Sequence, residues 1–214
     1  MKDLRISFIG RIISSYTHEV KNYLAIIKET NGLMRDVIEI KKSRGLDEKH
    51  FLGFIGCVDE QVGRATAITD YLYRFAHRME EDRATVHIND LIDELVALMS
   101  RLAYRKRISF NKMLRGGLPT TILNPMLFHY LLFCLIEVKM LSLQKNGVIS
   151  IGTHFSDGFF CVTLTSEGGI VPSSDTTGTS GAGEIEGIAM ELGAVISDNG
   201  SETVIKIPAV TQVK

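Results

Sequence analysis

The chain has 214 residues, with 24 Lys and Arg against 25 Asp and Glu, and a formal net charge of −1. This balance provides no strong attraction to nucleic acid or to an anionic membrane, so neither is expected as a partner. With 45% hydrophobic residues, 23% charged residues and only 4 prolines, the composition is typical of a folded globular protein and excludes a disordered or fibrous one.

The cysteines and the apolar stretches indicate a compartment. Cys57, Cys134 and Cys161 are odd in number, widely spaced and set among apolar residues, which favours a reducing compartment over a disulfide framework. The N-terminus lacks the apolar core of a signal peptide, and the most apolar stretch, residues 122–143, is interrupted by charged residues and a proline. We therefore expect a cytoplasmic protein without a membrane span.

Residues 4–83 contain no proline, and their apolar residues recur at helical spacing. With Ile13 at heptad position a, positions a and d form a continuous seam: Ile13, Tyr16, Val20, Tyr23, Ile27, Thr30, Met34 and Val37. A turn is predicted at residues 43–47, followed by a second helix to about Met79. Two antiparallel helices of this length cannot bury such stripes alone, so the pattern predicts a dimeric four-helix bundle.

After residue 83 the pattern changes to short alternating runs and separate helical segments, which predicts an α+β fold packed in layers. We place the boundary there, giving a helical hairpin at 1–83 and an α/β sandwich at 84–214. Asp157-Gly158 predicts a hairpin turn, and the Gly, Ser and Thr residues of 167–183 predict a loop. The expected strands are 85–88, 108–113, 148–155, 159–165, 194–197 and 203–207, and the expected helices are 89–105, 125–143 and 184–192.

The first helix carries the most informative string, His18-Glu-Val-Lys-Asn22. His18 falls at heptad position f, so its imidazole is expected to point away from the seam. Neutral imidazole can attack phosphorus, while Glu19 can act as an acid or base and the Asn22 amide can hold a water or a phosphoryl oxygen. Spacing alone favours a solvated polar helix face over a reactive site. It does exclude a zinc protease, which needs a second histidine where Asn22 stands.

The string and the Leu24, Ala25 and Ile26 that follow it resemble the phosphoacceptor box of bacterial sensor histidine kinases. In that family the box opens a helical hairpin that dimerises as a four-helix bundle, followed by an α/β ATP-binding domain. The resemblance implies that His18 carries a phosphoryl group. It also implies that Glu19 is the acid/base partner and that Asn22 aligns water for dephosphorylation of a response regulator.

The second half departs from the family at its nucleotide-binding motifs. Two asparagines four residues apart are expected on a long helix, and Phe133 and Glu137 are assigned to those positions. The Asp-x-Gly-x-Gly motif, whose aspartate reads adenine, is replaced by a sequence that ends in Glu167-Gly168-Gly169. Of the later lid glycines, only Gly187 keeps the family spacing. These residues mark a degenerate nucleotide site, and ATP binding is doubtful.

A good phosphoacceptor box beside a degraded ATP site resembles the dimeric histidine phosphotransferases of phosphorelays. The expected partners are response-regulator receiver domains, a hybrid sensor kinase and a second copy of the chain. The receiver would bring Mg²⁺, and neither a tightly bound cofactor nor a resident metal is expected. Two alternatives remain open: a histidine kinase with a diverged ATP site, and a dimeric scaffold or regulator that is never phosphorylated.

Overall fold

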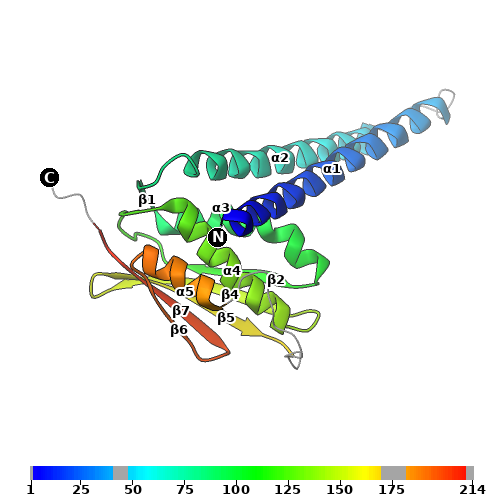
Figure 1. Ribbon diagram of the computed structural model, residues 1–214. Coiled ribbons are helices and arrows are strands. Elements are labelled where there is room, and N and C mark those ends of the chain that lie inside the picture. The colour runs from blue at the N-terminus through cyan, green and yellow to red at the C-terminus, as the bar shows by residue number, and fades with distance from the viewer. Residues whose placement is uncertain (1, 41–47, 170–181, 211–214) are drawn as a thin grey trace.

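The structure, a computed structural model, describes residues 2–40, 48–169 and 182–210. These ranges contain five helices and seven strands, so the predicted α+β class is confirmed (Figure 1). Two long helices come first and a mixed sheet covered by three helices follows. The predicted turn at 43–47 and most of the predicted loop at 167–183 lie outside the described residues.

The N-terminal hairpin consists of α1 (Lys2–Ile40) and α2 (Glu48–Arg78), which run antiparallel (Figure 1). Along α1 the predicted seam is half-buried or buried from Tyr16 onward. Within one chain the first residue of the seam, Ile13, is 49% exposed, whereas the neighbouring Ile12 is fully buried. The buried face rotates there because the base of α1 also packs on the α/β unit.

The main sheet has five strands in the order β2-β4-β5-β7-β6, with β2 and β4 parallel and the other pairs antiparallel. Asp157 and Gly158 have φ values of 54° and 78°, and they form the predicted tight turn between β4 and β5. A second sheet pairs β1 with β3, a strand that the sequence analysis missed. The strands are β1 Ala84–Val86, β2 Ser109–Leu114, β3 Thr121–Leu123, β4 Val148–Ser156, β5 Phe159–Glu167, β6 Val195–Asp198 and β7 Glu202–Pro208.

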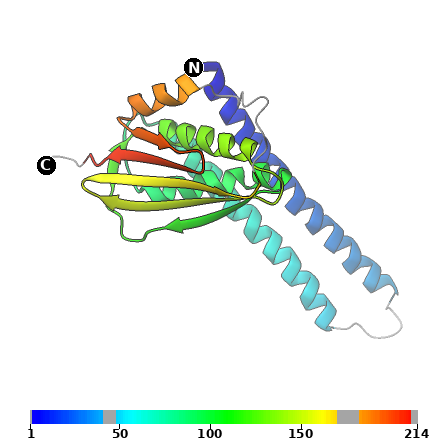
Figure 2. The same cartoon turned by 90° about the horizontal axis from the view of Figure 1, so that it is seen from below.

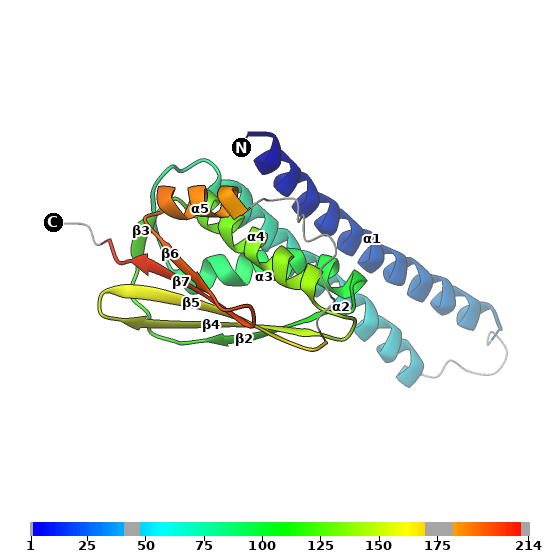
Figure 3. The same ribbon diagram turned by 60° about the horizontal axis from the view of Figure 1, so that its bottom comes forward.

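Helices α3 (Ile88–Arg105), α4 (Pro125–Ser142) and α5 (Ala182–Glu191) cover one face of the main sheet (Figure 3). Asn124 caps the N-terminus of α4, since its side chain accepts a hydrogen bond from the backbone amide of Leu127 at 2.9 Å. Pro125 at the first helical position has no amide hydrogen that would need a partner. By length and composition alone α4 is apolar enough to cross a membrane. However, 78% of it is buried inside this protein, as expected of a core helix.

Only the base of the hairpin, formed by the start of α1 and the end of α2, lies on the helical layer. The far end of the hairpin extends away from the α/β unit (Figure 2). At the base, α1 contacts α3 and α4, and α2 contacts α3. The helical layer is therefore enclosed between the sheet on one side and the hairpin base on the other. The His-Glu-Val-Lys-Asn string lies near the middle of α1.

Candidate functional site

His18 is exposed near the middle of α1. Successive helical residues are rotated by about 100°, so His18 points away from the side on which Val20 packs against the core. Its neighbours Thr17 and Lys21 are also exposed. The structure therefore has the imidazole in the predicted outward orientation, and the ring is accessible to a partner protein.

Glu19 and Asn22 are half-buried beside the exposed histidine. The pKa of the Tyr23 phenol is raised, chiefly by burial and then by the charge and a hydrogen bond of Glu19. Both effects favour the neutral phenol, so Tyr23 is suited to donate a hydrogen bond to the Glu19 carboxylate one turn away. In the described part of the chain no hydrogen bond joins the side chains of His18, Glu19 and Asn22, although they share two helical turns.

The α/β unit packs against α1 close to this string. The Ser15 hydroxyl donates a hydrogen bond of 2.8 Å to the carbonyl oxygen of Leu98 in α3, and both residues are buried. Ser15 lies less than one turn before His18. The α/β unit therefore contacts α1 within one turn of the histidine, which itself remains exposed.

The Phe133 side chain, assigned to the degenerate nucleotide site, faces the base of α1. Its ring centroid is 4.7 Å from that of Phe8, and the Arg11 guanidinium lies 5.0 Å from the centre of its ring. Phe133 is 2% exposed. The aromatic ring that stands where the family resemblance predicts an amide is thus used in packing between the hairpin and α4.

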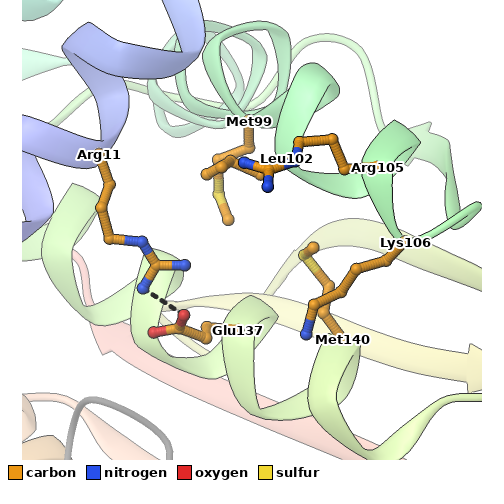
Figure 4. Close-up of a pocket in the computed structure, with 7 residues that line it drawn as sticks. All are labelled: Arg11, Met99, Leu102, Arg105, Lys106, Glu137 and Met140. Atoms are coloured by element: carbon orange, nitrogen blue, oxygen red, sulfur yellow. Dashed lines mark ion pairs between the residues drawn. The ribbon is translucent and has the colours of Figure 1, made fainter.

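Glu137 forms an ion pair with Arg11 across the junction of α1 and α4 (Figure 4). The carboxylate is largely buried, and its partner comes from the hairpin. The two α4 residues that the sequence analysis assigned to nucleotide or Mg²⁺ binding are therefore brought together, but against α1. Their side chains already have partners there.

Two of the three glycines assigned to the nucleotide site, Gly168 and Gly169, lie at close contacts. Gly168 has φ 134°, and a Cβ there would lie 3.1 Å from the Cα of Gly147. A Cβ at Gly169 would collide with the Gln144 side chain, and the Gly169 carbonyl accepts a hydrogen bond from the Gln144 amide at 2.8 Å. Both glycines thus permit close packing at the end of β5. Gly187 lies within α5 with open space around it.

A buried ionic cluster connects three helices, and the sequence analysis did not find it. Glu94 of α3 is 1% exposed and accepts hydrogen bonds from Arg78 of α2 at 3.2 and 3.4 Å. A second arginine, Arg74, lies 3.4 Å from the same carboxylate. Burial raises the pKa of Glu94, and the hydrogen bond and charge of Arg78 oppose that shift.

His129 of α4 completes this cluster. It is fully buried, and burial lowers its pKa to about 3, so the ring is neutral at physiological pH. Its Nε2 lies 3.0 Å from the Leu91 carbonyl oxygen, so a neutral ring donates from that nitrogen. The sequence contained a signal for this cluster. Glu94 lies at helical spacing among the apolar residues at 91, 95 and 98, which predicts a buried carboxylate, and a buried carboxylate requires partners.

Comparisons with known proteins identify the fold. No protein-family model matches the chain, and no curated protein matches it. Among solved structures, histidine kinase ThkA in complex with the response regulator TrrA is similar at a TM-score of 0.51 and 19% identity. That match covers 98% of this chain and 64% of that chain.

Two further structures are similar at a lower score. The Acinetobacter baumannii histidine kinase AdeS has 14% identity and a TM-score of 0.49, covering 91% of this chain and 98% of that chain. The catalytic domain of ThkA has 20% identity and a TM-score of 0.49, covering 61% and 97%. At such identity the likeness to the ThkA complex establishes the fold alone, and that fold is histidine-kinase-like.

Proposed function

We propose that this chain is a histidine phosphotransferase of a bacterial two-component phosphorelay. In this role His18 passes a phosphoryl group between the aspartates of receiver domains. The single observation that carries the proposal is the placement of His18, which is exposed on α1 within one turn of the Ser15 contact with α3, in a chain whose α4 packs against the same helix. The exposed histidine is accessible to a docked protein. Helix α4, which corresponds to the family's nucleotide-binding helix, packs against the hairpin instead.

The proposed reaction needs little machinery. A ring nitrogen of His18 attacks the phosphorus of a receiver aspartyl phosphate, a P–N bond forms, and the P–O bond to the aspartate breaks. The aspartate leaves as a carboxylate, and the imidazole loses its remaining proton to a base. Transfer to the next receiver reverses these steps. Positioning and charge neutralisation carry most of such a reaction, and the receiver would supply its own Mg²⁺.

Two neighbours have proposed roles in this chemistry. Glu19 accepts or returns the imidazole proton, and Tyr23 holds that carboxylate in place. Asn22 orients water when a receiver phosphate is hydrolysed rather than transferred, which would give the protein response-regulator phosphatase activity. An amide can position a water molecule but cannot itself accept a phosphoryl group.

The α/β unit is proposed to act without ATP. Glu167 stands at the motif that should read adenine, and it would place a negative charge near the expected nucleotide. Phe133 and Glu137 already have partners on α1. The unit then provides a docking surface for the receiver. Calorimetry with ATP and Mg²⁺ should detect no binding in the range usual for kinases.

The partners follow from the chemistry. The proposed donors and acceptors are receiver domains, one of which could belong to a hybrid sensor kinase, in the cytoplasm. ThkA, the structure with a similar fold, was solved bound to a response regulator. That neighbour supports receiver partnership for this chain without identifying the cognate receivers.

A homodimer is part of the proposal. Ile13, Leu24 and Ile38 are exposed on α1 at separations close to whole helical turns, so they share one face. On α2, Leu52 and Ile55 are also exposed. A second hairpin laid against these faces would complete a four-helix bundle and bury them.

One observation favours a second candidate, a histidine kinase with a diverged ATP site, because the fold is that of histidine kinases. A third candidate is a dimeric scaffold that binds receivers without being phosphorylated. The deciding experiment supplies ³²P as ATP in one reaction and as a phosphorylated receiver in another. Label transferred only from the receiver supports the phosphotransferase, label from ATP supports the kinase, and no label supports the scaffold.

The acceptor is identified by variants in the same experiment. His18→Ala should abolish labelling while the protein remains folded and dimeric, because an exposed side chain contributes little to packing. His154→Ala, which removes another exposed histidine, is the matched control and should be labelled normally. Full labelling of His18→Ala would overturn the proposed mechanism.

A further inference from the structure

A cavity of about 280 Å³ lies where α1, α3 and α4 meet (Figure 4). Three apolar side chains line part of it: Met99 and Leu102 from α3 and Met140 from α4. Met99 and Met140 are almost completely buried, at 1% and 5% exposure. Flexible thioether side chains can adjust to the shape of an apolar guest, so this lining suits a hydrocarbon or aromatic group.

The polar side of the cavity is rich in positive charge. Arg11, Arg105 and Lys106 line it together with a single carboxylate, Glu137. That carboxylate pairs with Arg11 (Figure 4). Within the described ranges, the side chains of Arg105 and Lys106 form no ion pair. The lining therefore has two more positive charges than negative ones.

Partial burial at this edge lowers the pKa of Lys106, and the charge of Arg11 lowers it further, while Glu137 opposes both effects. A cation whose charge is disfavoured in this way would be stabilised by an anion placed next to it. The position at the C-terminal end of α3 explains a preference for basic residues there. It does not explain the apolar cavity beneath them.

We propose that this cavity binds a small organic anion. Its apolar body would rest on Met99, Leu102 and Met140, and its phosphate or carboxylate would lie between Arg105 and Lys106. The volume is near the lower end of the roughly 300–1,000 Å³ typical of ligand pockets, so a compact aromatic acid or phosphate monoester fits and a nucleoside triphosphate does not. This inference goes beyond phosphoryl transfer at His18 and does not depend on it.

The experiment uses the full chain with ¹³C-methyl-labelled methionine and follows the methyl resonances of Met99 and Met140 by NMR. Met99→Leu and Met140→Leu assign the two signals. The probes are phenyl phosphate, benzoate, inorganic phosphate and benzyl alcohol. Saturable shifts with phenyl phosphate or benzoate support the proposal, and the tighter of the two identifies the acid group.

The two fragments of the ligand provide the specificity test. Inorganic phosphate lacks the apolar body and benzyl alcohol lacks the charge, so each should bind at least about tenfold more weakly than the better aromatic acid. If benzyl alcohol binds as well as the acids, the site is only an apolar cavity and the proposal fails. If no probe moves either methyl resonance at millimolar concentration, the proposal also fails.

Charge variants locate the acid group. Arg105→Gln and Lys106→Gln should each weaken binding about tenfold, as expected for the loss of one hydrogen bond to a charged group. Arg107→Gln is the matched control, since Arg107 is exposed, adjacent in sequence and absent from the cavity lining, and it should bind normally. Equal weakening by all three variants would indicate attraction to general surface charge and would overturn the assignment.

Discussion

The hairpin and the α/β unit differ in how much apolar surface a single chain buries. Of the eighteen large hydrophobic residues that are exposed in the described part of the chain, eleven belong to α1 and α2. The buried hydrophobic residues of the hairpin are Phe8, Ile12, Ile68 and Phe75, three of which lie near its base. The α/β unit, by contrast, contributes most of a continuous core, which is formed by α3, α4 and the sheet and is joined by those four hairpin residues.

This comparison shows that the two regions obtain their stability differently. The α/β unit has most of the buried core within one chain. The hairpin base is stabilised by docking on that unit, and its far end retains exposed apolar faces that fit a second copy. The part of the stability that comes from dimerisation of the hairpin should therefore increase with protein concentration.

The largest expected effect is on the junction between the regions. Phe133→Ala should lower the free energy of unfolding by about 3–5 kcal/mol, because a fully buried aromatic ring that contacts Phe8 is lost and a cavity is left. Urea denaturation measures the loss. The control Phe159→Ala removes a 40% exposed ring and should cost less than about 1 kcal/mol. Equal costs would contradict the view that α4 is packed against the hairpin.

A slightly smaller effect is expected from the buried ring of His129. Burial lowers its pKa from 6.5 to about 3, so the unfolded chain binds this proton more tightly than the folded one. The stability due to the neutral ring is fully present above pH 6.5 and decreases as the pH falls toward 3. Between pH 6.5 and 4.5 the loss should be about 2–3 kcal/mol.

Urea denaturation across this pH range tests the contribution of His129. The variant His129→Gln should show a flatter dependence of stability on pH. His154→Gln replaces an exposed histidine and should retain the slope of the unsubstituted protein. An unchanged slope in the His129 variant would mean that this ring is protonated in the folded state.

The third effect concerns the exposed face of the hairpin. Leu24 is 56% exposed in the single chain, and the proposed dimer would bury it. Leu24→Lys should weaken dimerisation by at least about tenfold, because burial of a leucine contributes about 1.5–3 kcal/mol. Analytical ultracentrifugation measures the dissociation constant. Glu29→Lys changes an exposed residue on another side of α1 and should leave it unchanged. A monomeric parent protein at micromolar concentration would contradict the four-helix bundle.

The smallest expected effect distinguishes a packing role of Tyr23 from a role in phosphoryl transfer. Tyr23→Phe removes the phenol that holds Glu19 and should cost about 0.5–1.5 kcal/mol of stability and slow phosphoryl transfer. Tyr16→Phe is the control one heptad earlier, since its hydroxyl lies 3.2 Å from that of Thr69. It should have a similar cost in stability and transfer phosphate at the usual rate. Equal rates in both variants would show that Tyr23 only packs.

Much of the fold could be predicted from the sequence because its signals are local. Heptad spacing predicted the two long helices, and Asp157-Gly158 predicted the tight turn between β4 and β5. The exposure of His18 followed from its heptad position alone. Strand β3 was missed because three residues are too few to show an alternating pattern, and its pairing with β1 is not local.

The packing of the hairpin on the α/β unit could not be predicted from these local patterns. Arg78, Glu94 and His129 are 16 and 35 positions apart in sequence and meet only after α2, α3 and α4 have packed. The sequence did hold a partial signal at the base of α1. Phe8 and Ile12 are one turn apart and lie off the heptad seam, which indicates a second apolar face and hence a second packing partner.

The connection between α2 and β1 has a mechanical consequence. Only residues 79–83 separate these elements, and the amides of Met79 and Glu80 still bond to carbonyls of the last helical turn at 3.1 Å. The last residue of α2, Arg78, is also bonded to Glu94 of the α/β unit. Because this connection is short and Arg78 is bonded to Glu94, a twist of α2 about its long axis would be transmitted to α3. A rotation at the far end of the hairpin would then change the orientation of α3 relative to His18.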